Sequence, residues 1–232
     1  MSTHKKTIIF VLLMVIQIIP SIILATDELS FIESYIDETS GIDGLSNANS
    51  VAISPDGNHV YVSGRGEGEM AVFSRNTTTG VLTFVEVHSS NISTPQEVTV
   101  SPDGANVYLA TAYGDNIIVY TRNETTGQLT FLEQITGLDF AISVNVSPDN
   151  NNVYVTHFND FAISVYGRNT STGALTFVES FNDPWWGGGI DGLEGPSSIV
   201  ISPDNNNVYV AGRSDNCIVV FSRNTTDGTL TL

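Results

Sequence analysis

The sequence repeats one short motif four times, and this repetition restricts the fold more than any other feature. The motif begins Ser-Pro-Asp and ends Val-Tyr plus an aliphatic residue; it occupies Ser54–Val62, Ser101–Leu109, Ser147–Val155 and Ser202–Val210. The copies keep the same spacing well beyond the motif, because Glu86, Glu133 and Glu179 each lie at the same distance from the serine that begins their motif. Regular repetition at this period indicates one structural unit per copy.

Each copy contains four short apolar stretches. In the first copy they are Val51–Ile53, Val60–Val62, Ala71–Phe73 and Leu82–Val85. These stretches are rich in β-branched and aromatic residues and are too short for helices, so they predict strands. The Ser-Pro-Asp-Gly/Asn sequence is typical of a turn between the first two strands. Each copy is therefore predicted to form four antiparallel strands, and the chain after residue 26 shows no helical period.

The predicted strands carry apolar residues on both faces, so one sheet alone is not stable. Burying a Val, Ile or Phe side chain contributes roughly 1.5–3 kcal/mol, which requires a neighbouring sheet on each side. Radial stacking of identical sheets satisfies this requirement and predicts an all-β fold, the β-propeller. A two-sheet sandwich is the alternative, but it does not explain four copies in step. We place the propeller domain at residues 26–232, with repeats at about 46–87, 94–134, 141–180 and 195–232.

Two stretches of the repeat resemble a known family. Asn152–His157, Asn-Val-Tyr-Val-Thr-His, resembles the YVTN-type propeller repeat, and Arg75–Glu86 is similar to blades of the lactonase-like seven-bladed β-propellers. The resemblance implies four-stranded antiparallel blades and a lactone-hydrolysing activity of the 6-phosphogluconolactonase type. Only about four blades are present where the family has seven, so a partial or truncated propeller is expected. Residues 29–34 repeat the fourth-strand pattern and predict the outer strand of a preceding blade or, in a closed four-bladed ring, of the closing blade.

The N-terminal residues have the pattern of an export signal. Lys5 and Lys6 precede an apolar run over residues 7–24, and Ala25 offers a small residue for cleavage. Residues 1–25 are predicted to be a signal peptide, with an uncleaved membrane anchor as the alternative. Either interpretation predicts a secreted or otherwise extracytoplasmic protein, and with cleavage no membrane span remains in the mature chain.

Charge and cysteine content narrow the classes of partner. The formal net charge is −17 and no lysine follows Lys6, so a nucleic acid partner is not expected. Cys217 is the single cysteine and forms no internal disulfide. The fold is therefore expected to depend on packing and strand pairing.

The resemblance implies that the site lies on the face that carries the loops between strands two and three and the inter-blade segments, which include Asp43, Glu97 and Asp139. Arginines that recur at one repeat position are interpreted as structural ion-pair or turn residues; they are Arg75, Arg122, Arg168 and Arg223. Arg65 and Arg213 remain, and together with His157 they are the catalytic candidates. An arginine, a histidine and nearby carboxylates polarise a carbonyl group and activate water. The alternative is that the arginines are solvated loop residues and that His157 caps a strand.

The variable loops also supply candidate binding residues. These are Tyr113, Asp115, Asp160, Trp185, Trp186, Asp191 and Asp215. Paired tryptophans suit contact with a sugar or a protein, or they fold back over the junction between blades. The carboxylates of Asp183, Asp191 and Glu194 suit Ca²⁺, but their spacing matches no established calcium loop, so no metal or cofactor is predicted.

Five of the six Asn-x-Ser/Thr sequons predict glycosylation sites if the source is eukaryotic, since the protein is expected to be exported. The asparagines are Asn76, Asn91, Asn123, Asn169 and Asn224. The sixth, at Asn145, lies in a predicted strand before Pro148 and is not expected to be used. The alternative is that Asn and Thr are favoured turn residues.

Two function hypotheses follow. The first is an extracytoplasmic binding module that contacts a protein or glycan through its loop face, with self-association through open blade edges. The alternative is a lactonase-like hydrolase of a small lactone.

Overall fold

The computed structural model describes residues 29–89, 92–183 and 189–232. The predicted signal peptide, residues 1–25, lies outside the described residues. Ile32–Leu232 form one compact unit, and the fold below is that of this unit. In the described part of the chain, no helix is long and apolar enough to span a membrane.

The described chain forms four sheets, each with four antiparallel strands in sequence order. Blade 1 contains β1 (Ala48–Ile53), β2 (His59–Gly64), β3 (Glu69–Arg75) and β4 (Leu82–His88). Blade 2 contains β5 (Pro95–Val100), β6 (Asn106–Thr111), β7 (Asn116–Arg122) and β8 (Leu129–Thr136). Blade 3 contains β9 (Ala141–Val146), β10 (Asn152–His157), β11 (Ala162–Arg168) and β12 (Leu175–Asn182). Blade 4 contains β13 (Pro196–Ile201), β14 (Asn207–Gly212), β15 (Cys217–Arg223) and β16 (Leu230–Thr231). The predicted all-β fold with four-stranded blades is confirmed.

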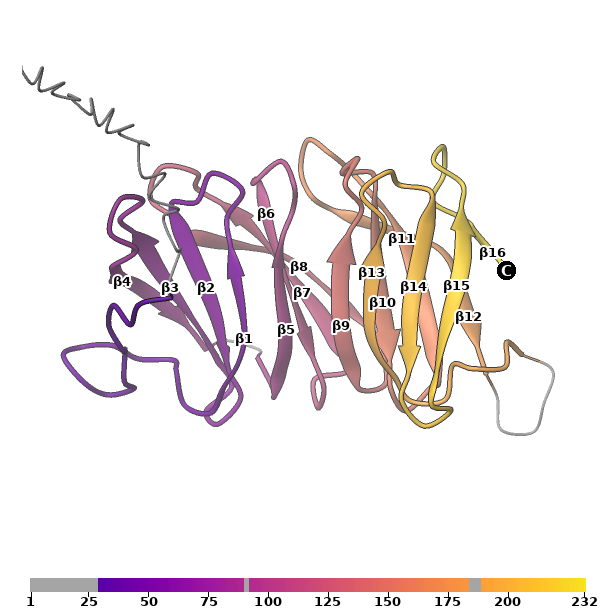
Figure 1. Cartoon of the computed structure of the whole chain (residues 1–232), viewed down its shortest axis with the longest axis horizontal. Helices are drawn as coiled ribbons and strands as arrows, with labels where there is room; N and C mark the ends of the chain where they lie inside the picture. Colours follow the sequence, from indigo (N-terminus) through magenta and orange to yellow (C-terminus); the bar gives the residue numbers. More distant parts are fainter. Residues whose placement is uncertain (1–28, 90–91, 184–188) are drawn as a thin grey trace, which may run out of the picture. The chain divides into compact units, whose positions relative to one another are not determined.

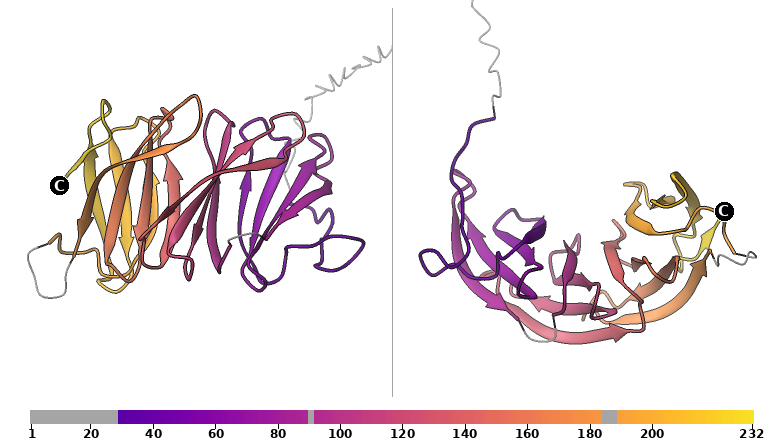
Figure 2. Two further views of the ribbon diagram at one scale, coloured as in Figure 1. Left: turned by 180° about the vertical axis from the view of Figure 1, so that it is seen from behind. Right: turned by 90° about the horizontal axis from the view of Figure 1, so that it is seen from below.

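The blades stand side by side as parts of a propeller (Figure 1). The first strand of each blade lies next to the first strand of the following blade, so β1, β5, β9 and β13 form the inner row. In the right-hand view of Figure 2 the four blades follow an open arc, which confirms the prediction of a partial propeller.

No strand forms at residues 29–36, so the outer strand expected at residues 29–34 is absent from this structure. A fourth strand needs a third strand beside it for its hydrogen bonds. Blade 4 is already completed by β16, which pairs with β15, and every other described third strand pairs with its own fourth strand. The segment therefore has no strand to pair with among the described residues.

Each interface between successive blades, here called a seam, is an apolar layer. Between blades 2 and 3, Tyr108 and Ile117 from one blade pack with Val144 and Val153 from the other, and all four are fully buried. Equivalent clusters fill the seam between blades 1 and 2 and the seam between blades 3 and 4. In blades 2 and 3 both apolar faces are therefore buried by stacking against a neighbouring blade, whereas blades 1 and 4 each have one face in a seam.

The Ser-Pro-Asp motif forms the turn that joins the first two strands of a blade. In blade 3 the Ser147 hydroxyl donates to Asp149 Oδ1 at 2.6 Å and accepts from the Asn152 amide at 3.0 Å. Asn150 has a φ of 65°, the left-handed region that Gly and Asn tolerate best. This turn requirement explains why the motif recurs with Gly or Asn after the aspartate.

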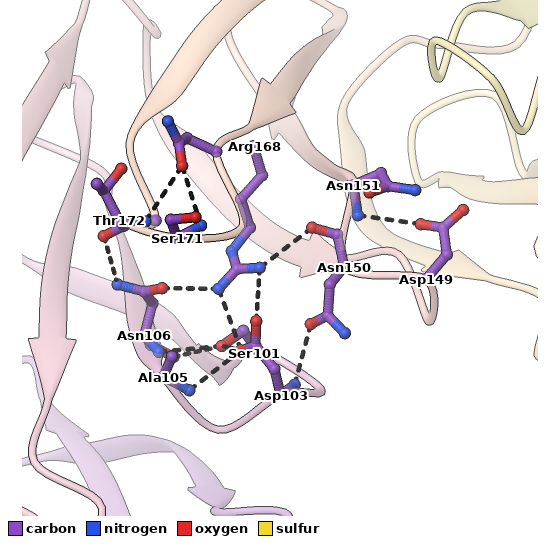
Figure 3. A network of polar contacts seen from close by, with 12 residues as sticks. Ser101, Asp103, Ala105, Asn106, Asp149, Asn150, Asn151, Arg168, Ser171 and Thr172 are labelled. Atoms are coloured by element: carbon purple, nitrogen blue, oxygen red, sulfur yellow. Dashed lines mark hydrogen bonds and ion pairs between the residues drawn. The ribbon is translucent and has the colours of Figure 1, made fainter.

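A buried arginine connects each seam; we call this contact the arginine lock. Arg168 of blade 3 reaches into blade 2, where Nε donates to Tyr108 Oη at 2.8 Å. Its Nη1 lies 2.8 Å from Asp103 Oδ2 (Figure 3). Its Nη2 also donates to Asn106 Oδ1 at 2.7 Å. The guanidinium is completely buried, and its charge is paired with a carboxylate.

The same lock recurs at the other two seams. Arg122 binds Asp56 and Tyr61, and Arg223 binds Asp149 and Tyr154. The interpretation of the recurring arginines as structural ion-pair residues agrees with this geometry. Arg75, at the same repeat position in blade 1, donates to the Gly57 carbonyl at 3.0 Å, a bond within its own blade.

We expect Arg168→Ala to lower the free energy of unfolding by about 3 kcal/mol, because it leaves a partly buried carboxylate and a buried tyrosine hydroxyl without their partner. Arg75→Ala is the matched control, since Arg75 occupies the same repeat position without a lock, and should cost less than about 1 kcal/mol. Urea denaturation of both variants measures the difference. Equal losses would contradict a role for the lock in stability.

Stability should fall in acid because of the aspartates in the locks. Burial raises the pKa of Asp149, but the Ser147 hydroxyl, the Asn151 amide and Arg223 together outweigh it and hold that pKa below its ordinary value. A lowered pKa in the folded state stabilises the protein above the unfolded pKa of about 3.9, and this stabilisation is lost as pH falls through the folded value. The urea midpoint should therefore decrease between about pH 5 and pH 2. In Asp149→Asn the urea midpoint should decrease less over this pH range. A decrease as large as in the unmodified protein would show that Asp149 is not responsible.

Candidate functional site

The loops between the second and third strands lie beside the inter-blade segments on one face of the arc. Backbone hydrogen bonds join them in every blade: Arg65 N to Asn47 O at 3.2 Å, Ala112 N to Thr94 O at 3.0 Å, Phe158 N to Phe140 O at 3.0 Å and Arg213 N to Gly195 O at 3.1 Å. We call this side the loop face. It is the face that the family resemblance implied.

Several residues of the loop face have a strained backbone. Thr94 has a φ of 52°, Phe140 of 60° and Phe161 of 52°, which β-branched and bulky residues seldom adopt. Thr94 and Phe140 directly precede the first strand of their blades, as Asn47 and Gly195 do with the same sign of φ. The surrounding hydrogen bonds hold this conformation and so fix the direction in which the chain enters the first strand of each blade.

A polar hollow of about 230 Å³ lies where the four inner strands begin. Its lining comes from all four blades: Asn49 and Ser50 of β1, Gln96 and Glu97 of β5, Ile142 and Ser143 of β9, and Ser197 and Ser198 of β13. We call it the inner-strand hollow. Its lining residues all belong to β1, β5, β9 and β13, the inner row of strands.

Hydrogen bonds across the seams hold the wall of the inner-strand hollow. Asn49 Nδ2 donates to the Gln96 carbonyl at 2.7 Å, which joins blades 1 and 2. The Ser143 hydroxyl donates to the Glu97 carboxylate and accepts from the Ile199 amide at 3.2 Å, which joins blades 2, 3 and 4. Each of these polar groups is therefore positioned by a neighbouring blade.

Glu97 is the acidic group of this wall. Its Oε2 accepts from the Val144 amide at 2.9 Å as well as from Ser143. Burial raises the pKa of Glu97 above its ordinary value, and the two hydrogen bonds oppose that rise only in part. A carboxylate with a raised pKa in a polar hollow is suited to accept and return a proton.

Sequence reasoning placed Glu97 in an inter-blade segment and did not select it. A signal was present: at this repeat position the other copies have Ser50, Ser143 and Ser198. A carboxylate that replaces serine inside a strand is a departure from the repeat.

The structure does not gather the three catalytic candidates in one hollow. Arg65 Nη1 donates to Asn49 Oδ1 at 3.5 Å, which places this guanidinium next to the inner-strand hollow. Arg213 is exposed on the loop face of blade 4. His157 is buried at the end of β10, and its Nδ1 lies 3.5 Å from Asp160 Oδ2. Burial lowers the pKa of His157, and Asp160 opposes this in part.

His157 lines a different space, a groove of about 590 Å³ between blades 2 and 3. The other walls are Ile135–Leu138 at the end of β8 and residues of β11 and β12, including Ser164 and Asn182. His157 therefore does not line the hollow that holds Glu97.

The predicted aspartates of the loop face bind backbone amides. Asp115 Oδ1 accepts from Phe140 N at 3.0 Å, Asp160 Oδ2 from Asp139 N at 3.2 Å and Asp215 Oδ2 from Glu194 N at 2.7 Å. Each fixes the inter-blade segment that follows its own blade or leads into it. These contacts give Asp115, Asp160 and Asp215 a structural role.

Tyr113 is exposed and belongs to an aromatic row on the loop face. Its ring stacks edge-to-face on Phe140 at 5.4 Å, and Phe140 lies 6.0 Å from Phe158. Sequence reasoning selected Tyr113 but not the two phenylalanines, which come from other loops. Trp185 and Trp186 lie outside the described residues.

Carboxylate oxygens of Asp183, Asp191 and Asp215 lie within 4.8 Å of one another. Asp183 and Asp191 belong to the group considered for calcium, whereas Glu194 does not join them. Asp183 Oδ2 already accepts from the Gly192 amide at 3.0 Å. A second acidic group contains Asp43, Glu67 and Glu69.

The sequon asparagines Asn76, Asn123, Asn169 and Asn224 are exposed at the start of the hairpins between the third and fourth strands. Their Oδ1 atoms accept backbone amides two residues ahead, as Asn76 does from Thr78 at 3.0 Å, so they are turn residues whatever their modification. Asn91 lies outside the described residues.

Comparison with solved structures shows the fold. A periplasmic gluconolactonase from Pseudomonas aeruginosa superposes with a TM-score of 0.66 at 22% identity, over 80% of this chain and 52% of that one. A functionally unknown protein from Desulfotomaculum acetoxidans has a TM-score of 0.65 at 22% identity, over 80% and 57%. Hydrazine synthase from Kuenenia stuttgartiensis has a TM-score of 0.60 at 21% identity, over 86% and 52%. The chain thus spans little more than half the length of these three solved structures.

A comparison with curated proteins found no match. The family model described as "Lactonase, 7-bladed beta-propeller" matches residues 22–144 and 183–232, well over half of the chain. This match agrees with the four-stranded blades and with the repeat that first indicated the resemblance. The chain belongs to the lactonase family of seven-bladed β-propellers.

Proposed function

We propose that this protein hydrolyses a small lactone and that the inner-strand hollow is the wall of its active site. The observation that supports this most directly is Glu97, a carboxylate with a raised pKa held in a polar hollow to which all four blades contribute. Membership of the lactonase family and the fold shared with a gluconolactonase agree with the proposal.

The chemistry requires a base and a group that stabilises an oxyanion. As the water oxygen bonds to the lactone carbonyl carbon, Glu97 removes a proton from that water, and the carbonyl oxygen becomes an oxyanion. The oxyanion then re-forms the carbonyl, the ring C–O bond breaks, and the released ring oxygen takes the proton from Glu97. The product is the open hydroxy acid.

Arg65 is the cation placed next to this wall by its bond to Asn49. A guanidinium at this position stabilises negative charge on the carbonyl oxygen during attack. We assign it that role in place of the predicted group of Arg65, His157 and Arg213, because His157 lines a different groove.

The charge of the protein favours a neutral substrate. With a formal net charge of −17, the protein repels anions, including phosphorylated sugars. A neutral sugar lactone therefore suits this chain better than a phosphorylated one. The N-terminal signal pattern supports an extracytoplasmic location for the reaction.

The aromatic row of Tyr113, Phe140 and Phe158 favours a second function, the binding of a glycan or protein on the loop face. Aromatic rings in a row present apolar area that stacks on sugar rings or protein side chains. This function does not require Glu97, so a substitution of Glu97 should affect hydrolysis and leave binding unchanged.

We expect the chain to hydrolyse gluconolactone and Glu97→Gln to lower kcat by about 100-fold or more, because the amide accepts no proton from water. The acid limb of kcat/KM should have its midpoint above the ordinary glutamate value of about 4.3, since activity needs ionised Glu97 and burial raises its pKa. The rate at which base must be added to hold the pH constant, recorded at several pH values, gives both kcat and the midpoint of the acid limb.

Glu124→Gln, an exposed glutamate of the hairpin between β7 and β8, is the matched control and should leave kcat unchanged. Tyr113→Ala should also leave hydrolysis intact. Full activity in Glu97→Gln would remove this carboxylate from the mechanism, and no hydrolysis by the unmodified chain would leave the binding function as the better proposal.

A further inference from the structure

The groove that His157 lines between blades 2 and 3, here called the seam groove, takes no part in the proposed hydrolysis. Glu97 lines the inner-strand hollow, and His157 does not. The volume of the seam groove, about 590 Å³, falls within the range of about 300–1,000 Å³ that is typical of small-molecule sites. The seam groove is therefore large enough to be a second binding site.

The seam groove lies where the repeat has a serine in place of an aliphatic residue. Ser164 of β11 occupies the repeat position of Ile118 in blade 2 and Val219 in blade 4, since each pairs with the last residue of the Ser-Pro-Asp motif of its blade. Ile118 is fully buried in the apolar layer of its own seam, and Val219 is 7% exposed in the next. A serine at this position gives up apolar contacts between the blades and leaves space in their place.

His157 supplies an unpartnered hydrogen-bonding atom to the wall of the seam groove. Its side chain is 5% exposed, and Nε2 is buried without a hydrogen-bond partner among the described residues. At the same repeat position in blade 2, Thr111 Oγ1 donates to Asn116 Oδ1 at 3.0 Å, so the side chain there is satisfied within its own blade. Buried polar atoms are nearly always paired, because an unmade hydrogen bond destabilises the fold. His157 Nε2 is therefore an atom that a ligand can satisfy.

Asp160 determines which nitrogen of the imidazole is available. Its Oδ2 lies 3.5 Å from Nδ1, a contact that holds the hydrogen of the neutral ring on Nδ1 and leaves the lone pair on Nε2. Burial lowers the pKa of His157, which favours the neutral ring. Asp160 is itself fixed by the Asp139 amide at 3.2 Å. Nε2 is therefore an acceptor and requires a ligand group that donates a hydrogen bond.

The other side chains of the wall indicate the class of ligand. Leu138, Leu175 and Phe177 form an apolar part, and Phe177 is 58% exposed. Ser180 and Asn182 of β12 form a polar part whose hydroxyl and amide groups both donate and accept. Ligand hydroxyls match such partners because they also donate and accept, whereas an ammonium group only donates and a carboxylate only accepts.

The net charge of the protein also restricts the ligand. At −17 the chain repels anions, so a neutral molecule is favoured over a sugar acid or a sugar phosphate. A sugar ring combines neutral hydroxyl groups with an apolar face that stacks on an aromatic ring. It therefore matches both parts of the wall.

We propose that the seam groove binds a neutral sugar ring, with a ligand hydroxyl donating to His157 Nε2 and the apolar face of the ring against Phe177. Ser164 provides the space, and Asp160 positions the imidazole. This site is separate from the inner-strand hollow and does not depend on the proposed hydrolysis.

Two substitutions test the space and the acceptor. Ser164→Ile introduces the side chain that blade 2 has at this position; it should raise the midpoint of thermal unfolding, because apolar contacts fill the groove, and should weaken sugar binding at least about tenfold. His157→Leu removes the acceptor without removing a partner of Nε2, and should weaken binding about tenfold. Saturation-transfer NMR of the full chain, titrated with D-glucose, D-galactose and D-mannose to roughly 10 mM, measures binding in the millimolar range expected for a single ring.

Matched probes and variants serve as controls. D-glucuronate and D-glucosamine present the glucose ring with a negative or a positive charge, and both should bind more weakly than D-glucose. Thr121→Ile adds the same aliphatic side chain at an exposed position of β7 outside the groove and should bind like the unmodified chain. Glu97→Gln and Tyr113→Ala should also keep binding, which separates this site from the inner-strand hollow and from the aromatic row. Circular dichroism checks that each variant is folded.

The proposal is overturned if none of the three neutral sugars binds, since water alone would then fill the groove. It is also overturned if Ser164→Ile and His157→Leu bind sugar like the unmodified chain, because the sugar would then lie elsewhere. Tighter binding of D-glucuronate or D-glucosamine than of D-glucose would contradict the neutral class of ligand.

Discussion

Every seam described in this protein depends on a buried arginine that reaches from one blade into the preceding one. The guanidinium of Arg168 loses its hydration completely, and the carboxylate of Asp103 and the hydroxyl of Tyr108 replace the lost contacts. Because the arginine lies on one blade and its aspartate and tyrosine partners lie on the preceding blade, no single blade forms the lock alone. Stability is therefore transmitted from each blade to the next, as in other repeat proteins whose units contact only their neighbours.

The locks lie at the ends of the blades where the Ser-Pro-Asp turns and the Asn-containing hairpins meet, and this leaves the loop face free to vary. Each first strand starts on the loop face after a residue with a positive φ, which fixes its direction. As a result, four strand starts from four blades meet in the inner-strand hollow, where Ser143 connects Glu97 to blade 4. The repeated strands and turns thus form a constant scaffold that positions the variable residues of the site.

The fold does not decide between chemistry and binding. Structures that share it include a gluconolactonase and hydrazine synthase, and function is determined by the side chains that line the site. Here one set of residues, around Glu97, has the environment of a proton acceptor. Another set, the row of Tyr113, Phe140 and Phe158, has the character of a contact surface. They lie on the same side of the arc, so a ligand held by the aromatic row and a reaction at the inner strands are compatible.

The sequence by itself determined the strands, the turns, the stacking of sheets and the structural arginines, because each follows from short-range pattern repeated four times. Val60–Val62 follows a Ser-Pro-Asp-Gly turn, and this pairing of a turn with a short apolar stretch predicts a strand. Arg122 stands at the same repeat position as Arg168 and Arg223, which predicts a shared structural role. Tertiary structure alone decided the site. Glu97 meets Ser143 across a seam, Phe140 meets Tyr113 from another loop, and His157 turns into a groove away from Arg65. The physical reason is that these contacts depend on how successive blades are rotated against each other, and no local pattern records that rotation.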